Sequence, residues 1–211
     1  MSISVKTFVL GEVSTNTYIV TEDETGVTAV VDPSVADGEL LKFIENLDVK
    51  YILLTHGHFD HIMGAEAVKK ATGAKIVIHK DDEIAFTDGK ISLISYHHPE
   101  INLNLNGDII VEDGTNIPFG NTNIYVMHTP GHTRGGVCYI FENEKLLFSG
   151  DTLFKLSAGR TDFIGGNPRT EILSLRKIAA LDGDYKVYPG HGESTTLSYE
   201  RQYNRYIKFR G

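Results

Sequence analysis

The sequence predicts an α/β protein in which two mixed β-sheets pack face to face and helices cover their outer sides. Three observations favour this fold class. Runs typical of β-strands, followed by helical patterns, occur in both halves of the chain. No low-complexity linker separates the two halves. The length of 211 residues is enough to bury a substantial core. We therefore expect one domain that spans residues 1–211.

The first half opens with three runs that predict strands, because each is rich in β-branched or aromatic residues and is bounded by turn residues. These runs cover residues 5–10, 16–20 and 27–32. The next segment, 36–48, predicts a helix, since Leu40 and Ile44 lie on one helical face. The continuous apolar run 51–55 is typical of a strand that is buried on both faces.

A second helix and strand follow in the same half. The segment 62–73 predicts a helix that ends at Gly73. Residues 75–80 predict a strand, and residues 81–86 a short helical turn. No periodic pattern continues through 87–107, so we expect a long surface loop there, of a length that is often functional.

The second half repeats the order of strands followed by helices. Its predicted strands cover residues 108–114, 122–129, 136–141, 145–150 and 186–189. Asn167 and Pro168 form an N-cap and N1 pair that opens a helix over 168–181. The C-terminal segment 198–210 is also expected to be helical.

Composition excludes several classes of protein. The net charge is −8 and no block of Lys or Arg occurs, which argues against a nucleic-acid partner. No segment reaches the ~20 apolar residues of a membrane span, and the N-terminus lacks the features of a signal peptide. Cys138 is the only cysteine, so we expect no internal disulfide, a small core side chain at that position, and a cytoplasmic location.

The stretch THGHFDH at 55–61 is the strongest functional signal. It follows a predicted buried strand, and strand ends are where α/β folds expose functional groups. It supplies four potential metal ligands, which are His56, His58, Asp60 and His61. Imidazole and carboxylate groups suit zinc, iron or manganese. Four ligands this close in the chain cannot easily all bind one tetrahedral ion, but they could bind two adjacent ions. Gly57 would let the loop fold closely around these ions.

Three later strands also end in a potential ligand beside a glycine. His132 lies in TPGHT, Asp151 in FSGDT and His191 in YPGHG. Four strand ends with seven His or Asp candidates are hard to reach by chance. By contrast, His79, His97, His98 and His128 lack such a context, and we expect them to be partly exposed residues that bind no metal.

These motifs, in this order, resemble those of the metallo-β-lactamase superfamily over nearly the whole chain. The resemblance implies a four-layer αβ/βα sandwich with a dinuclear metal site at one edge. It implies that His56, His58 and His132 hold one ion and that Asp60, His61 and His191 hold the other. Asp151 would bridge the two ions, which are expected to be zinc, with iron or manganese as alternatives.

Within the superfamily, GDTLFKLSAGRTDFIGGN and YPGHGESTT look most like the small glyoxalase II-like (hydroxyacylglutathione hydrolase-like) hydrolases. A subgroup of the superfamily has a cysteine at the position of Asp151, which disfavours a true β-lactamase here. Full-length glyoxalase II carries a C-terminal helical domain that contacts glutathione. This chain ends about twenty residues after YPGHG, so we expect no such domain.

The expected activity is hydrolysis of an acyl thioester of the S-lactoylglutathione type, a small-molecule substrate. Metal ions lower the pKa of bound water from ~15.7 towards ~7, and the resulting hydroxide attacks the carbonyl. Asp60 is the candidate for orienting it as a general base. A thiolate with a pKa near ~8.5 departs without a dedicated acid, which favours a thioester over an amide.

Other readings of the site remain open at this level. A related branch of the superfamily uses one iron, which here would be held by His56, His132 and Asp151, to oxidise persulfides with oxygen. A hydrolase of esters or lactones and a non-catalytic metal-binding module are further alternatives. Phe59 and Arg160 are candidates for substrate contact, although Phe59 equally fits a core aromatic and Arg160 fits an ion pair with Asp162 better.

Overall fold

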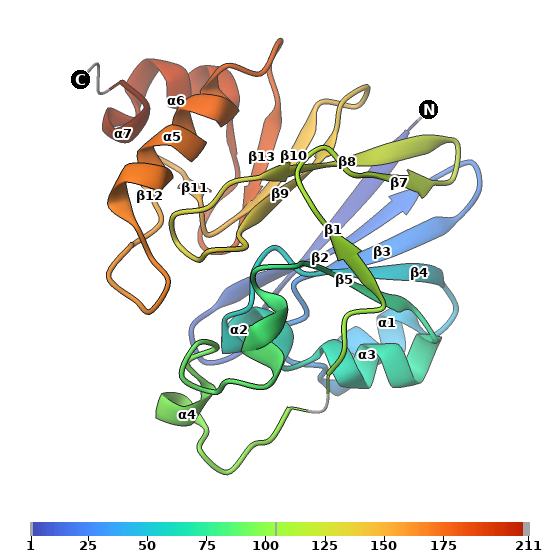
Figure 1. The fold of residues 1–211 in the computed structure, drawn as a ribbon. Coiled ribbons are helices and arrows are strands. Elements are labelled where there is room, and N and C mark those ends of the chain that lie inside the picture. The colour runs from blue at the N-terminus through green and yellow to red at the C-terminus, as the bar shows by residue number, and fades with distance from the viewer. Residues whose placement is uncertain (1, 104, 209–211) are drawn as a thin grey trace.

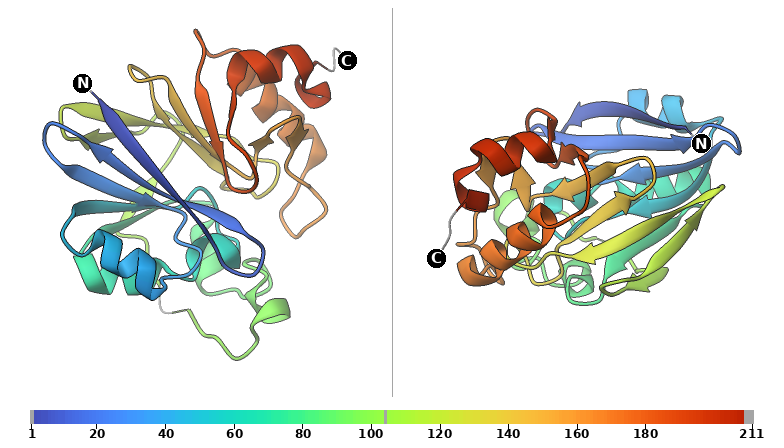
Figure 2. Two further views of the ribbon diagram at one scale, coloured as in Figure 1. Left: turned by 180° about the vertical axis from the view of Figure 1, so that it is seen from behind. Right: turned by 90° about the horizontal axis from the view of Figure 1, so that it is seen from above.

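The computed structural model describes residues 2–103 and 105–208. It shows two six-stranded sheets packed face to face, with helices on both outer sides (Figure 1). The views in Figure 2 place α1 (Gly38–Ile44) and α3 (Ala65–Thr72) on the opposite side of the sheets from α5 (Pro168–Ala179). The predicted α/β class and the four-layer αβ/βα sandwich are confirmed.

The first sheet contains the N-terminal strands in sequential order. Its members are β1 (Ile3–Leu10), β2 (Thr15–Glu22), β3 (Val27–Val31), β4 (Asp48–Leu53), β5 (Lys75–His79) and β6 (Ile109–Val111). The first three strands pair antiparallel, and β3 to β6 pair parallel. The carboxyl ends of β3, β4 and β5 therefore meet at one edge of the sheet.

The second sheet contains the C-terminal strands in the order β14-β13-β10-β9-β8-β7. Their bounds are β7 (Asn116–Phe119), β8 (Thr122–His128), β9 (Val137–Phe141), β10 (Leu146–Gly150), β13 (Lys186–Pro189) and β14 (Thr195–Thr196). Because β9 is antiparallel to both β8 and β10, and β13 is parallel to β10, the strands β8, β10 and β13 run in the same direction. A separate two-stranded ribbon joins β11 (Leu153–Phe154) and β12 (Ser157–Ala158).

Three hydrophobic clusters correspond to the three contacts between layers. Leu40 and Val68 of the first helical layer pack with Ile52 and other side chains of the first sheet. Tyr139 and Phe148 of the second sheet lie in the cluster between the two sheets. Leu175, Ile178, Cys138 and Ile140 are among the side chains that join α5 to the second sheet. Cys138 is fully buried, as predicted.

Helix ends follow the sequence signals closely. The side chain of Asn167 accepts hydrogen bonds from the backbone N–H groups of Arg169 and Thr170, so it caps α5 as predicted. Gly73 ends α3 with φ of 74°, a left-handed conformation that costs glycine little. Two short helices close the described chain, α6 (Leu197–Tyr203) and α7 (Arg205–Lys208).

Several predicted boundaries were wrong. The helix expected over 62–73 begins only at Ala65, as α3, and a separate short helix, α2 (Phe59–Ile62), precedes it. The break lies at Gly64, where a Cβ atom would lie 2.6 Å from the carbonyl oxygen of Pro33. The helical prediction for 198–210 extends to residues 209 and 210, which lie outside the described residues. The short strands β7, β11, β12 and β14 were not predicted, because a run of two to four residues has too little pattern to detect.

The expected surface loop 87–107 is also more structured than predicted. The short 3-10 helix η1 (Glu83–Phe86) precedes it, and it contains α4 (Ile94–His97). Leu93 and Ile94 are buried in a small cluster with Phe59. This segment therefore has a core of its own, built from too few residues to give a periodic signal.

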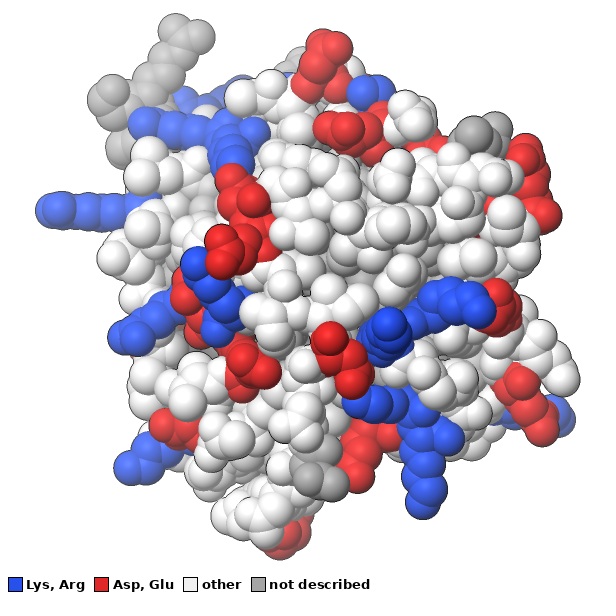
Figure 3. Space-filling model, turned by 45° about the vertical axis from the view of Figure 1, so that its right-hand side comes forward, with Lys and Arg blue, Asp and Glu red and all other residues white. Residues whose placement is uncertain are grey.

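The surface carries mixed charge. On the face shown in Figure 3, Lys and Arg side chains are interspersed with Asp and Glu side chains. Among the described residues, none of the helices has both the length and the apolar composition needed to cross a bilayer.

Candidate metal centre

The seven predicted ligands converge at one edge of the sandwich because of strand direction. His56 follows β4 in the first sheet. His132, Asp151 and His191 follow β8, β10 and β13, the three strands of the second sheet that run in the same direction. The two edges are held together by backbone hydrogen bonds from Asn16 N–H to the Gly190 carbonyl and from Val137 N–H to the Thr55 carbonyl, 2.7 and 2.8 Å long.

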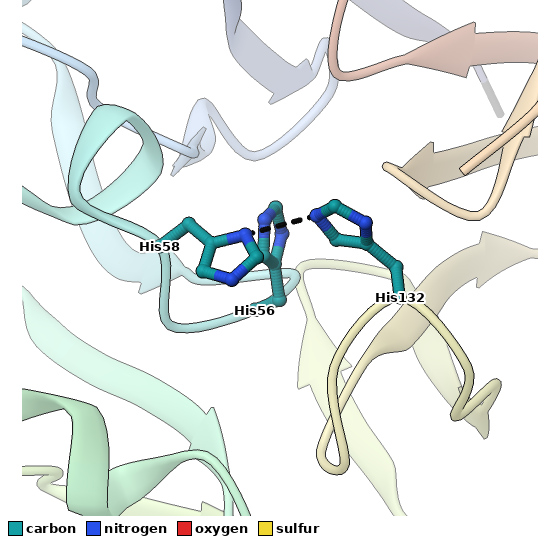
Figure 4. Close-up of side chains that lie close together, drawn as sticks. All are labelled: His56, His58 and His132. Atoms are coloured by element: carbon teal, nitrogen blue, oxygen red, sulfur yellow. Dashed lines mark hydrogen bonds between the residues drawn. The ribbon is translucent and has the colours of Figure 1, made fainter. Parts of the chain in front are cut away.

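The first cluster of ligands contains His56, His58 and His132 (Figure 4). Figure 4 shows His56 and His58 on one loop and His132 on another, with their rings turned towards one another. Nε2 of His132 lies 2.9 Å from Nδ1 of His58. Nδ1 of His132 donates to the Arg160 carbonyl at 2.7 Å, which leaves its Nε2 for the cluster.

The second cluster contains Asp60, His61 and His191. Oδ2 of Asp60 lies 3.2 Å from Nε2 of both histidines. Asp151 lies between the clusters, because its carboxylate oxygens are 3.5 Å from His61 and His191 and 3.6 Å from His132. The structure thus brings together all seven side chains that the sequence singled out.

Burial and mutual charge shift the pKa values of these groups in opposite directions. Burial and the neighbouring imidazoles lower the pKa of His56 well below its usual value and that of His58 to about 3. Burial acts in the same sense on His61, but Asp60, Asp151 and Asp32 outweigh it and raise the pKa of His61. Burial is also outweighed at His191, whose pKa rises to about 10 because of Asp151 and Asp60. The imidazoles beside carboxylates thus favour the charged form, whereas His56 and His58, which lie among other imidazoles, favour the neutral form.

The donor set fits divalent metal ions. Nε2 of His56, His58 and His61 and Oδ1 of Asp151 are buried without a hydrogen-bond partner among the described residues. Buried polar atoms without partners are costly, and four of them among the seven converging side chains indicate a site for cations. The first cluster could hold one ion, the second could hold another, and Asp151 could contact both.

Asp32 supports this centre and was not singled out from the sequence. Its Oδ2 accepts from Nδ1 of His61 at 2.9 Å and from the Thr55 hydroxyl at 2.6 Å. Since a carboxylate can only accept, His61 keeps its proton on Nδ1 and presents Nε2 to the cluster. Asp32 directly follows β3 with φ of 48°, an unusual conformation for a residue other than glycine. The sequence feature that could have identified Asp32 is its position at the end of a predicted strand, in VVDPS.

Asp82 is a second supporting carboxylate that the sequence did not identify. Its oxygens accept from Gly57 N–H at 3.0 Å, from the Thr133 hydroxyl at 2.7 Å and from Gly135 N–H at 2.6 Å. Burial raises its pKa, against the effect of these donors. Asp82 therefore ties the loop of His56 and His58 to the loop of His132.

Gly57 has a different role from the one expected. A Cβ atom at this position would lie 2.5 Å from Cβ of Ala85 and 3.1 Å from the carbonyl oxygen of Asp82. The missing side chain thus allows close packing against η1. Gly190 is the glycine that faces the ligands, because a Cβ there would lie 2.1 Å from Oδ1 of Asp151 and 2.8 Å from Cε1 of His61.

An open cavity of about 760 Å³ lies over the ligands. His58, Asp60, His132, Asp151 and His191 form part of its lining. Phe59 and Arg160, the two candidates for substrate contact, line it as well. Phe59 is nonetheless buried in the cluster with Leu93, and Arg160 makes two hydrogen bonds of 2.7 Å with Asp162. Both readings of each residue are therefore compatible with its position.

The remaining histidines belong to other contacts. His79 is buried, not partly exposed as expected, and stacks on His128 with ring centroids 4.1 Å apart. Asp81 lies close to this pair. His97 stacks on Phe59 with centroids 4.4 Å apart, and His97 and His98 both lie near Glu12.

Comparisons with known proteins agree with this geometry. Residues 10–191 match the family described as the metallo-beta-lactamase superfamily. The chain is 33% identical to the hydroxyacylglutathione hydrolase GloC of Haemophilus influenzae over 196 residues, which cover 91% of this chain and 92% of the relative. The crystal structure of the B3 metallo-beta-lactamase BLEG-1 superposes with a TM-score of 0.91 at 31% identity, covering 98% of this chain and all of that one. The structure of TTHA1623 in a di-iron-bound form gives a TM-score of 0.83 at 29% identity, covering 96% of this chain and all of that one.

Proposed function

The chain belongs to the metallo-beta-lactamase superfamily, and from this membership and the arrangement of its site we propose that it hydrolyses acyl thioesters with two divalent metal ions. The observation that carries the proposal is the pair of ligand clusters with Asp151 between them, directly beneath an open cavity. The similarity to a hydroxyacylglutathione hydrolase supports the choice of thioesters as the substrate class.

The proposed ligand sets are the two clusters. His56, His58 and His132 would hold one ion. Asp60, His61 and His191 would hold the other, with Asp151 shared between them. Two ions in these positions would make water acidic enough to ionise at neutral pH and would polarise the substrate carbonyl. We favour zinc, and the di-iron form of TTHA1623 makes iron the first alternative to test.

Asp60 is the proposed catalytic carboxylate. It lines the cavity, and the Thr15 hydroxyl donates to its Oδ2 at 2.8 Å, which fixes the orientation of the carboxylate. The proximity of His61 and His191 lowers its pKa despite burial, so that it is ionised and can accept a hydrogen bond from the attacking water. In the reaction, the oxygen of water bonds to the carbonyl carbon as one of its O–H bonds breaks and the proton passes to the Asp60 carboxylate. The carbon–sulfur bond then breaks, its electron pair leaves on the thiolate, and the acyl group is released as a carboxylic acid.

The choice of a thioester over an amide rests on the ionisable groups around the cavity. Apart from the proposed metal ligands, the described lining includes two such groups, His97 and Arg160. Both lie beside carboxylates, those of Glu12 and Asp162. An amine leaving group needs a proton from an acid, whereas a thiolate with a pKa near ~8.5 leaves without one. The site therefore suits the thioester better.

The test is thiol release by purified protein loaded with zinc, iron or manganese. S-lactoylglutathione, acetyl and butyryl thioesters of an uncharged thiol, a matched oxygen ester, a lactone and a β-lactam form the substrate panel. We expect thiol release that requires about two ions per chain by elemental analysis, is lost with a chelator, and falls steeply in Asp60→Asn. Absence of thiol release by fully loaded protein would reject the proposal. Oxygen uptake with glutathione persulfide, at one iron per chain, would instead support persulfide oxidation.

A further inference from the structure

The wall of the cavity over the ligands is mainly apolar and aromatic. Beyond the proposed ligands, its lining includes Val13, Phe59, Leu93, Phe154 and Phe163. These side chains come from the β1–β2 turn, from α2 and the segment before α4, and from the region around the β11–β12 ribbon. Several separate segments thus present apolar surface to the same space.

The rings in this wall are held in place by neighbouring groups. Phe59 is 3% exposed and lies beneath the ring of His97. Phe163 packs against the cluster of Phe59 and Leu93, and the guanidinium carbon of Arg160 lies 4.1 Å from its ring centroid. A wall ordered in this way loses little conformational freedom when it binds a ligand.

The same rings adjoin both ligand clusters. The centroid of Phe163 is 5.6 Å from that of His58 and 6.2 Å from that of His132. The centroid of Phe154 is 6.2 Å from that of His191. A carbonyl carbon that reached the ligands would therefore have its two substituents among these rings.

The cavity has little to offer an anionic substituent. Arg160 is the one Lys or Arg in the described lining, and its Nε and Nη2 already donate to the carboxylate of Asp162, which offsets the positive charge that a substrate carboxylate would meet. His97 lies 3.5 Å from Glu12. Among the described lining residues, the wall therefore has no Lys or Arg without a carboxylate partner of its own.

From this wall, and resting on the proposed function, we infer that the site selects thioesters with apolar, uncharged acyl groups and gains little from carboxylates on the leaving thiol. The acyl chain packs between the aromatic side chains and is removed from water there. Each buried methylene is worth ~0.8 kcal/mol, which corresponds to about a fourfold increase in kcat/KM.

The experiment measures kcat/KM for acetyl, butyryl and hexanoyl thioesters of one uncharged thiol, and for the butyryl thioester of glutathione, with metal-loaded protein. We expect a rise of about fifteenfold from acetyl to butyryl, set by two methylenes, and a further rise to hexanoyl. The glutathione and uncharged thioesters should differ by less than about threefold. Equal rates along the acyl series, or a preference for glutathione above about tenfold, would overturn the inference while leaving thioester hydrolysis intact.

Variants and a binding measurement separate this inference from the proposed function. Phe163→Ala should flatten the dependence on chain length, and Phe163→Leu should retain most of it. Leu173→Ala, an exposed residue on α5 outside the cavity lining, should leave the dependence unchanged. Calorimetric titration with non-hydrolysable alkyl thioethers of the uncharged thiol should show tighter binding for longer chains, even if no thioester turned over. Affinity independent of chain length would reject the inference by itself.

Discussion

The two halves of the molecule supply the candidate metal centre in different ways. The first sheet provides four ligands from one loop after β4, and α2 begins within that loop. The second sheet provides one ligand from each of three loops, which follow β8, β10 and β13. In the first case the chain brings the groups together locally, and in the second case the parallel direction of three strands does so.

The two sets of ligands therefore depend on different supporting hydrogen bonds. The contiguous loop is held from within its own sheet, because Asp32 at the end of β3 binds both Thr55 and His61. The separated ligands need contacts across the sandwich. Asp82 provides such a contact, since it joins the loop of Gly57 to the loop of Thr133 and Gly135.

We expect the largest loss of activity from a substitution at Asp151, which lies between the two ligand clusters. Asp151→Asn removes negative charge from a carboxylate that lies near ligands of both clusters. Since metal ions supply several kcal/mol of transition-state stabilisation, we expect kcat/KM to fall by at least ~10³-fold. Elemental analysis should find fewer than two ions per chain. Asp48→Asn, at an exposed ion pair with Lys50, is the matched control and should behave as wild type. An Asp151→Asn protein with two ions and normal activity would contradict the shared role of Asp151.

The two supporting carboxylates should have smaller effects that differ between the halves. Removal of a partner that orients metal ligands costs ~10–100-fold in metal affinity. Asp32→Asn should weaken metal binding mainly because His61 loses its carboxylate partner. The backbone should be little affected, since asparagine also tolerates the left-handed conformation at this position. Asp82→Asn should weaken binding and also lower the free energy of unfolding by ~1–3 kcal/mol, as buried donors lose an acceptor.

Competition with a chromogenic chelator measures the affinities of these two variants, and denaturant titration of metal-free protein measures their stability. Equal metal affinity in wild type and Asp82→Asn would show that the contact between the loops is not needed to shape the centre.

Two glycines near the candidate metal centre should differ in the effect of an added methyl group. Gly57→Ala adds a methyl group against Ala85, so we expect a loss of stability of ~1–3 kcal/mol through overpacking. Gly190→Ala adds a methyl group against Asp151 and His61, so we expect weaker metal binding, by roughly tenfold, in a protein of nearly normal stability. Gly38→Ala, where a Cβ atom meets nothing within 4 Å, is the control for both measurements. If Gly57→Ala weakened metal binding and Gly190→Ala lowered stability instead, the roles assigned to the two glycines would be wrong.

The smallest effect is expected for Cys138 of the second sheet, which a thiol reagent should not label in the native protein. Burial raises the pKa of Cys138 to about 12, so at pH 8 its thiolate is scarce and inaccessible. We expect no labelling of the native protein by a thiol reagent within an hour, and complete labelling in denaturant. Rapid labelling under native conditions would indicate that the second sheet opens more easily than its packing against α5 suggests.

Much of this protein was predictable from local patterns. The alternating or continuous apolar runs identified the long strands, and the Asn167–Pro168 pair located the start of α5. The spacing of His56, His58, Asp60 and His61 indicated a metal site because so many ligands rarely fall within one loop without one. These features depend on residues that are neighbours in the chain, so the sequence alone determined them.

The supporting carboxylates and the apolar wall of the cavity depend instead on contacts between distant segments. Asp32 and Asp82 look like ordinary turn residues in the sequence, and their roles depend on partners such as His61 and Gly135 that lie far along the chain. The apolar wall around Phe59 and Phe163 likewise comes from segments that meet only after the sheets pack. Contacts between distant segments are set by strand direction and sheet packing, which a local pattern does not encode.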